Sequence, residues 1–233
     1  MFKRKKEKLE NPLNSPGLIS MLNPKSIVAE QFRIVRTNLE FSIVDKDLKS
    51  LLVTSLAPSA GKSTISANLA ATFASQGKKV LLVDTDMRKP TIHKIFKLRN
   101  NDGLSTLITS KEAVIADFII KSEFKNVYIL PSGATPPNPA ELISSKRMEQ
   151  LIEEMERVFD LVIFDTPPVL AVADSQIMAG KVDGTLFVLR KGVDTKEQIQ
   201  SANERMKSVN ANVLGAIYNR IEPNDDAYYY EYI

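Results

Sequence analysis

A strand–loop–helix pattern at residues 51–74 constrains the fold of this chain more than any other feature. The apolar run LLVTSL is followed by the small-residue loop APSAG, then by Lys62, Ser63 and a helical pattern. The first amides of a helix have no partner within it, so they can bind an anion such as a phosphate. Lys62 would add a positive charge there, and Ser63 a hydroxyl suited to Mg²⁺. The pattern predicts a nucleotide-binding loop; a turn that only caps a helix is the less favoured alternative.

The loop departs from the standard pattern G-x-x-x-x-G-K-[ST] at its glycines. Leu56 occupies the first glycine position, and Ser59 stands where a further glycine is common. Side chains at these positions restrict the backbone, so the phosphate-binding amides are expected from Pro58 onward. Lys62 is expected to be an exposed loop residue. The predicted phosphate-loop residues are Pro58, Ser59, Ala60, Gly61, Lys62, Ser63 and Thr64.

Acidic residues follow two further apolar runs that resemble buried strands. Asp84 and Asp86 end the run at residues 79–86, and Asp165 ends the run at 161–165. A period of two would place Asp84 and Asp86 on the same face of a continuing strand. Ligands collect at the carboxyl ends of the strands in a parallel sheet, so we expect the three acids to meet the phosphate loop there. Asp165 has the position of a Walker B acid.

Strand-like runs alternate with helical patterns along the rest of the chain. Further strands are expected at 126–131, 182–190 and 212–220, and Asp174 is expected to cap a short helix. This alternation predicts an α/β protein with a doubly wound, mainly parallel sheet, helices on both faces and a P-loop NTPase fold. Longer helices are expected at residues 26–44, 111–123, 140–159 and 195–208.

Composition limits the available chemistry and partners. The chain has no cysteine and one histidine, which excludes disulfides and argues against a zinc site or a histidine-based triad. Its formal net charge of +3 is too small to predict a nucleic-acid partner. No apolar run approaches the roughly 20 residues of a membrane span, and no signal peptide is visible, so a cytoplasmic location is expected.

The organisation expected is one domain with two tails. Residues 1–25 are predicted to be a flexible basic segment, either simply solvated or weakly attracted to an anionic membrane. Residues 26–222 form the predicted P-loop domain, and residues 223–233 a tyrosine-rich tail. The tail tyrosines lack the spacing of a helix or strand face. They are either a segment packed on a partner or hydroxyls offered for phosphorylation: Tyr228, Tyr229, Tyr230 and Tyr232.

The first predicted helix carries an E-x-x-R-x-x-R pattern. Its apolar side chains form a narrow stripe at positions 28, 32, 35 and 39, and Ser26 can cap its start. At about 100° per residue, Glu30, Arg33 and Arg36 are expected to face away from that stripe. They form either a solvated face or a contact between subunits, and the spacing alone does not choose between the two.

Five features together resemble the bacterial tyrosine kinases (BY-kinases) of capsule and exopolysaccharide operons, in the form with a separate cytoplasmic kinase. The resemblance extends over residues 26–233. It implies an ATP-dependent protein-tyrosine autokinase that phosphorylates its C-terminal tyrosines in trans and regulates capsular or exopolysaccharide synthesis and export. The five features are the E-x-x-R-x-x-R helix, the loop Pro58–Thr64, the pattern Asp84-x-Asp86-x-Arg88, the strand ending at Asp165 and the tyrosine tail.

The resemblance also implies roles for single residues. Lys62, Asp84 and Asp86 would be catalytic, with Asp84 as the base that takes the tyrosine proton. A base is useful because a tyrosine hydroxyl has a pKa of about 10. Ser63, Asp86 and Asp165 would hold Mg²⁺, directly or through water, while the phosphate loop holds ATP.

Partners follow from the same resemblance. A membrane-anchored activator, or chain-length regulator, would recruit the kinase to the inner face of the membrane. The unphosphorylated protein would form a homo-oligomeric ring through Glu30, Arg33 and Arg36, and a cognate tyrosine phosphatase would reverse the modification. Asn219 and Arg220 would lie on the adenine side of the nucleotide.

Two other classes remain as alternatives. The partitioning and site-selection switch ATPases share the sheet and the paired acids, but carry a signature lysine where this chain has Ala57. They also lack a tyrosine tail. The other alternative is a nucleotide-dependent scaffold without catalytic activity. Transfer of label from ATP to protein tyrosine would separate a kinase from both.

Overall fold

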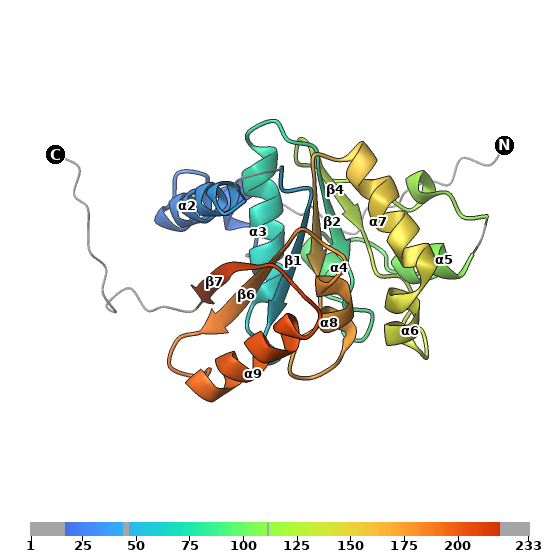
Figure 1. Ribbon diagram of the computed structural model, residues 1–233. Helices are drawn as coiled ribbons and strands as arrows, with labels where there is room; N and C mark the ends of the chain where they lie inside the picture. Colours follow the sequence, from blue (N-terminus) through green and yellow to red (C-terminus); the bar gives the residue numbers. More distant parts are fainter. Residues whose placement is uncertain (1–16, 44–46, 111, 220–233) are drawn as a thin grey trace.

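A seven-stranded sheet forms the centre of the protein (Figure 1). The computed structural model describes residues 17–43, 47–110 and 112–219. The strand order is β3-β4-β2-β5-β1-β6-β7, and every neighbouring pair is parallel except β3 with β4. The strands are β1 (Ser50–Ser55), β2 (Val80–Asp84), β3 (Ile120–Lys121), β4 (Val127–Leu130), β5 (Leu161–Asp165), β6 (Gly184–Arg190) and β7 (Val213–Asn219).

Helices cover both faces of this sheet, which confirms the predicted fold class. Successive strand side chains point to opposite faces, so Leu51 and Val53 pack with α1 to α4, while Leu52 packs with α5 to α9. A short 3-10 helix, η2, spans Ile115–Asp117. The α-helices are α1 (Ile19–Leu22), α2 (Ile27–Phe41), α3 (Lys62–Ala74), α4 (Ile92–Ile95), α5 (Leu104–Thr109), α6 (Pro139–Ser144), α7 (Lys146–Val158), α8 (Asp174–Ala179) and α9 (Lys196–Lys207).

The three central strands β2, β5 and β1 are buried along their whole length. Strands covered on both faces need continuous apolar runs, which is the pattern their sequences show. Their register aligns their carboxyl ends, because Asp84 pairs with Asp165 and Asp165 in turn with Val53. The fold therefore brings the segments that follow β1, β2 and β5 to one edge of the sheet.

Two predicted helices differ from the structure. The helix predicted at 111–123 is wrong: this segment contains η2 and β3, and Ile120 pairs with Ile129 in β4. The edge of β4 provides backbone hydrogen-bond partners for this segment. The spacing of apolar residues within the segment does not indicate such a distant partner. The helix predicted at 140–159 is divided into α6 and α7 by Ser145, whose extended backbone interrupts it and whose side chain caps α7.

The N-terminal boundary also differs from the expected one. Residues 17–25, expected within a flexible segment, contain α1, and Leu18 is fully buried. The Asn68 side chain accepts from Ser20 N at 2.8 Å and donates to Gly17 O at 2.6 Å, which fixes this segment on α3. Residues 1–16 and the predicted tail 223–233 lie outside the described residues. In the described part, no helix combines the length and apolarity required to cross a bilayer.

Candidate active site

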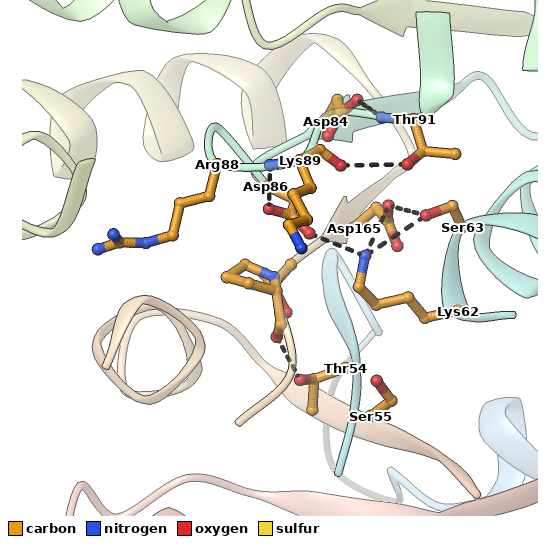
Figure 2. A network of polar contacts seen from close by, with 12 residues as sticks. Thr54, Ser55, Lys62, Ser63, Asp84, Asp86, Arg88, Lys89, Thr91 and Asp165 are labelled. Atoms are coloured by element: carbon orange, nitrogen blue, oxygen red, sulfur yellow. Dashed lines mark hydrogen bonds and ion pairs between the residues drawn. The ribbon is translucent and has the colours of Figure 1, made fainter. Parts of the chain in front are cut away.

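The predicted phosphate loop and the three predicted acids meet at the carboxyl edge of the sheet (Figure 2). The loop follows β1, Asp84 ends β2 and Asp165 ends β5. Thr85 N donates to Asp165 O at 2.8 Å, which extends the pairing of β2 with β5 past the last strand residue. Asp86 follows in the next turn and is also buried. The convergence expected from strand order is therefore present in the structure.

The backbone of the phosphate loop is left-handed at two of its small residues. Gly61 has φ 87° and serves as the N-cap of α3, while Ser59 has φ 62°. Both values lie in the left-handed region that favours glycine, so Ser59 holds a glycine-like conformation with a side chain present. Pro58 and Thr64 are exposed, whereas Ala60 is buried. The N-terminus of α3, without a side-chain cap, is available to an anion.

Lys62 is the first residue of α3 and lies among the acids. Its Nζ is 3.1 Å from Asp86 Oδ2, 3.6 Å from Asp165 Oδ2 and 3.4 Å from Ser63 Oγ. Only 11% of the side chain is exposed, so the expectation of an exposed loop residue is wrong. Burial by itself lowers the pKa of Lys62, but the charges of Asp165 and Asp86 outweigh it and raise that pKa. The ammonium stays charged and neutralises part of the acid cluster.

Asp165 is held by two serine hydroxyls of α3. Ser63 Oγ donates to Asp165 Oδ2 at 2.6 Å, and Ser66 Oγ donates to Asp165 Oδ1 at 3.1 Å. Burial raises the pKa of Asp165, against the opposite effects of Lys62 and Ser63. Ser66 is a residue that the sequence analysis missed. Its position one helical turn after Lys62, on the side of α3 that faces β5, could have indicated this contact.

Asp84 is fully buried, and only one of its oxygens has a partner. Its Oδ2 accepts from Thr91 N at 2.9 Å and Ile92 N at 3.0 Å, at the start of α4. Its Oδ1 is buried without a hydrogen-bond partner. Burial, reinforced by the charge of Asp165, raises the pKa of Asp84 to about 8. The side chain thus combines a capping contact with an acceptor that lacks a partner.

The chemistry of these donors suits Mg²⁺ bound together with a nucleotide. Carboxylate and hydroxyl oxygens are the ligands that Mg²⁺ prefers, and it commonly takes one or two carboxylates plus phosphate oxygens and water. Among residues 17–43, 47–110 and 112–219, no three acidic or histidine side chains are grouped closely enough to form a metal site by themselves. A shared site of Ser63, Asp86, Asp165 and phosphate oxygens fits both observations.

Comparison with known proteins agrees with this geometry. A family model described as an AAA domain matches residues 59–186. Tyrosine-protein kinase YwqD of Bacillus subtilis (strain 168) is 48% identical over 203 residues, which cover 87% of this chain and 85% of that protein. The chain belongs to the bacterial tyrosine-protein kinases. The solved kinase domain of Escherichia coli tyrosine kinase ETK aligns with a TM-score of 0.86 and 33% identity, covering 98% of this chain and 89% of that chain.

A more distant structure shares the fold alone. The cell division ATPase MinD of Pyrococcus furiosus is 24% identical, with a TM-score of 0.64 over 76% of this chain and 74% of that chain. The predicted kinase family is confirmed, and the switch ATPases are related to it by fold. The chain is an enzyme of the protein-tyrosine kinase class, and its P-loop fold implies that it binds nucleotide.

One of the two residues predicted for the adenine side can be placed in the kinase. Asn219 ends β7, and its Nδ2 donates to Ala60 O in the phosphate loop at 2.8 Å. A Cβ at Gly61 would lie 2.3 Å from that nitrogen and would displace the Asn219 amide, and the φ of 87° at Gly61 also favours glycine. Asn219 therefore contacts the loop itself. Arg220 and the four predicted acceptor tyrosines lie outside the described residues.

The E-x-x-R-x-x-R helix of the kinase is rotated from its predicted orientation. Glu30 is exposed and pairs with Arg33, whose Nε is 2.7 Å from Glu30 Oε2. Arg36 instead is buried against α3, where its Nη1 donates to Thr72 O at 3.4 Å. The prediction that Arg36 faces away from the core is therefore wrong. Ala29 is buried on the same side of α2, which packs against α3. Its small side chain leaves room for this contact.

The kinase also contains an ion pair that the sequence analysis did not predict. Asp174 was expected to cap a helix, but the N-cap of α8 is Ala173, without a side-chain cap. Asp174 is fully buried and accepts two hydrogen bonds from Arg88. The sequence feature that could have indicated this pair is Arg88 in the pattern Asp84-x-Asp86-x-Arg88, for which the sequence analysis predicts no function. The pairing of Arg88 with a buried aspartate far along the chain cannot be read from either local pattern.

Proposed function

We propose that the protein is an ATP-dependent autokinase that phosphorylates Tyr228, Tyr229, Tyr230 and Tyr232 in trans and so regulates capsular or exopolysaccharide synthesis and export. The observation that carries the proposal is the meeting of Lys62 with Asp86 and Asp165 beside the N-terminus of α3. Phosphoryl transfer requires mainly positioning and charge neutralisation, and these groups supply both.

The phosphate loop and Lys62 hold the outer phosphates of ATP in this proposal. The amides at the start of α3 bind phosphate oxygens, and the Lys62 ammonium turns from the acids toward them. Ser63, Asp86 and Asp165 hold Mg²⁺, directly or through water. When bound, the ion neutralises charge on the outer phosphates. The proximity of Lys62 to Asp86 supports this placement, because a cation lies beside these acids.

Asp84 acts as the base. Its Oδ2 is held by two amides, so Oδ1 is the atom that takes the tyrosine proton. The phenolic oxygen then forms a bond to the γ-phosphorus as the bond to the bridging oxygen breaks, and ADP leaves with that electron pair. A pKa of about 8 matches a base that works near neutral pH.

Mixing two variants, neither of which can label itself, tests whether the reaction runs in trans. One carries Lys62→Met and an intact tail; the other carries an intact site and Tyr→Phe at all four tail positions. Labelled ATP is added to each alone and to the mixture. We expect tyrosine label only in the mixture, on the Lys62→Met chain. Label on neither chain, with phosphate release by the tail variant, would favour a switch ATPase. Label that appears only in unmixed wild type would show transfer in cis.

A membrane-anchored protein is proposed as the activator. Family resemblance supports a partner whose cytoplasmic tail completes the active form and holds the kinase at the inner face of the membrane, while a cognate phosphatase reverses the reaction. A partner-tail peptide should raise the rate of self-labelling. Equal rates with and without the peptide would remove the activator from the proposal.

Assembly is proposed to depend on phosphorylation. The unphosphorylated chain forms a ring through the outer face of α2, where Glu30 and Arg33 lie with the exposed side chains Ile27, Ile34 and Phe41. Each phosphotyrosine adds about −1.5 to −2 charges to an acidic tail, which weakens its binding to the acid-rich site of a neighbour. Light scattering at low salt should find an oligomer without phosphate and a monomer with it. Equal masses would contradict the switch.

A further inference from the structure

An arginine–aspartate pair connects the turn that contains Asp86 to the segment that follows Asp165. Arg88 Nε donates to Asp174 Oδ2 at 2.9 Å, and Arg88 Nη2 donates to Asp174 Oδ1 at 3.1 Å. Asp174 is fully buried, while 41% of the Arg88 side chain is exposed. The two-bond geometry fixes the orientation of both groups, which a single charge contact would not do. Figure 2 shows the Arg88 side chain extending away from Lys62 and Asp165.

Arg88 belongs to the turn that positions Asp86. Lys89 N donates to Asp86 Oδ1 at 3.0 Å, which leaves Oδ2 directed at Lys62. Met87, between Asp86 and Arg88, is fully buried. Asp86 is thus held in a short turn whose far side is fixed by the Arg88 guanidinium.

Asp174 belongs to the segment that follows Asp165. This segment is fixed to β1, because Thr54 Oγ1 donates to Pro167 O at 2.8 Å and Val169 N donates to Ser55 O at 2.8 Å. Asp174 begins α8 at its end. The Asp165 loop is therefore attached to the centre of the sheet, and the Asp86 turn is attached to that loop through Arg88.

We propose that Arg88 and Asp174 are positioning residues that set the placement of Asp86 relative to Asp165, and so the affinity for the metal ion bound with the nucleotide. The pair acts through Asp86 and does not touch the nucleotide. This inference rests on the proposed function, which assigns Asp86 and Asp165 to the metal. Groups that orient metal ligands typically change metal affinity by about 10- to 100-fold when they are lost.

A second buried pair provides a matched control. Arg190 Nε and Nη2 donate to Asp194 Oδ1 at 3.1 and 2.7 Å, and the Asp194 side chain is also fully buried. Arg190 ends β6 and Asp194 follows it, so this pair joins no predicted metal ligand to another. Asp194→Asn should lower the melting temperature as Asp174→Asn does, because both replace a buried carboxylate that accepts from an arginine with a weaker acceptor. Asp194→Asn should not alter the gain in nucleotide affinity that Mg²⁺ produces.

The test is the affinity of the full chain for a non-hydrolysable ATP analogue, measured with and without Mg²⁺. The ratio of the two affinities measures the contribution of Mg²⁺ to nucleotide binding, separately from the contribution of the phosphate contacts. In Asp174→Asn and Arg88→Lys, we expect the ratio to fall about tenfold, with the metal-free affinity unchanged. Arg88→Lys keeps a positive charge but cannot form both hydrogen bonds, so it tests geometry in a variant that retains the ion pair.

Two further variants keep the result decisive. The double variant Arg88→Met/Asp174→Leu removes both charges, so its melting temperature should recover while the Mg²⁺ ratio stays low. An unchanged ratio in Arg88→Lys and in the double variant would overturn the inference and leave a structural pair only. Asp165→Asn tests the proposed function independently: if that variant retains the full ratio, the metal placement itself fails, whatever the effect of Arg88.

Discussion

The acid-rich edge of the sheet and the helix α2 carry the two clearest charged patterns of the chain, yet they behave differently. Asp84, Asp86 and Asp165 are buried at the carboxyl edge of the sheet, as their positions predict, and Asp86 and Asp165 lie 3.1 and 3.6 Å from Lys62 Nζ. On α2, Arg36 occupies the buried side that was expected to be apolar. Both patterns contain charges at regular spacing, so regularity alone does not explain the different outcomes.

The difference lies in what determines each orientation. The carboxyl end of a buried parallel strand has one place in the sheet, and its side-chain direction follows from strand pairing. A helix at the margin can rotate about its axis to fit its neighbour, and a long arginine stem can cover apolar surface while its head finds carbonyl oxygens. Arg36 does this at the C-terminal turn of α3, where Thr72 O accepts its hydrogen bond.

The largest expected effect is that of Lys62→Met. Loss of this cation from the phosphate site should lower tyrosine labelling by roughly 10³-fold or more, as loss of a transition-state cation does in related phosphoryl transfer. Anti-phosphotyrosine blotting measures the labelling. The circular dichroism spectrum should stay native at 25 °C, while the melting temperature falls because buried acids lose their partner.

Lys78→Met is the control for this variant. Lys78 pairs with Glu40 at 3.0 Å, beyond the other end of α3, so labelling should be unaffected. Added Mg²⁺ should raise the melting temperature of Lys62→Met more than that of wild type, because the ion no longer competes with the ammonium for Asp86 and Asp165. Undiminished labelling in Lys62→Met would remove the phosphate loop from the reaction.

The next effect is that of Asp165→Asn on metal dependence. The amide keeps the size of the side chain but loses the charge that holds Mg²⁺, so the gain in nucleotide affinity from Mg²⁺ should fall about 10- to 100-fold. Titration of a fluorescent ATP analogue at several Mg²⁺ concentrations measures it. Asp160→Asn is the control, because Asp160 precedes β5 at the opposite end and accepts from Lys79 N. A loss of equal size in both variants would contradict the placement of the metal.

Arg36→Ala and Arg33→Ala compare the two sides of α2 directly. Removal of the buried Arg36 should lower the free energy of unfolding by about 1–3 kcal/mol, since a buried hydrogen bond and packing are lost. The Arg33 side chain is 36% exposed, pairs with exposed Glu30 and donates to Pro24 O at an exposed contact, so its removal should cost less than about 1 kcal/mol. Urea unfolding measures both. Equal losses would mean that the helix orientation is not what separates the two arginines.

The smallest effect is expected on self-association. Ile27, Ile34 and Phe41 recur at seven-residue intervals, and 73%, 55% and 79% of each is exposed. Ile34→Ser should weaken the unphosphorylated oligomer by about 1 kcal/mol or more per contact, through lost apolar burial. The double change Glu30→Ala/Arg33→Ala should weaken it less, and mainly at low salt. Sedimentation at two salt concentrations separates them. A stronger effect of the charged pair would assign the contact mainly to Glu30 and Arg33, as the sequence analysis expected.

Local sequence was sufficient for the parts of the kinase whose geometry is local. Gly61, Lys62 and Ser63 after an apolar strand predict a phosphate loop, because the loop backbone and the helix start are formed by adjacent residues. Asp84 and Asp165 end continuous apolar runs, and central parallel strands place such ends at one edge. Three of the five features behind the family resemblance contain these residues, and the comparisons bear out the family.

Tertiary structure decided every feature that depends on a distant partner. Residues 120–121 form a strand only because β4 has an edge to pair with. Arg36 is buried only because α3 presents a carbonyl at that point, and Asp174 meets Arg88 only because the loops after β2 and β5 lie side by side. Spacing along the chain specifies which side chains share a face. Which neighbour that face meets is set by packing free energy summed over the whole domain, and it becomes definite only in the folded chain.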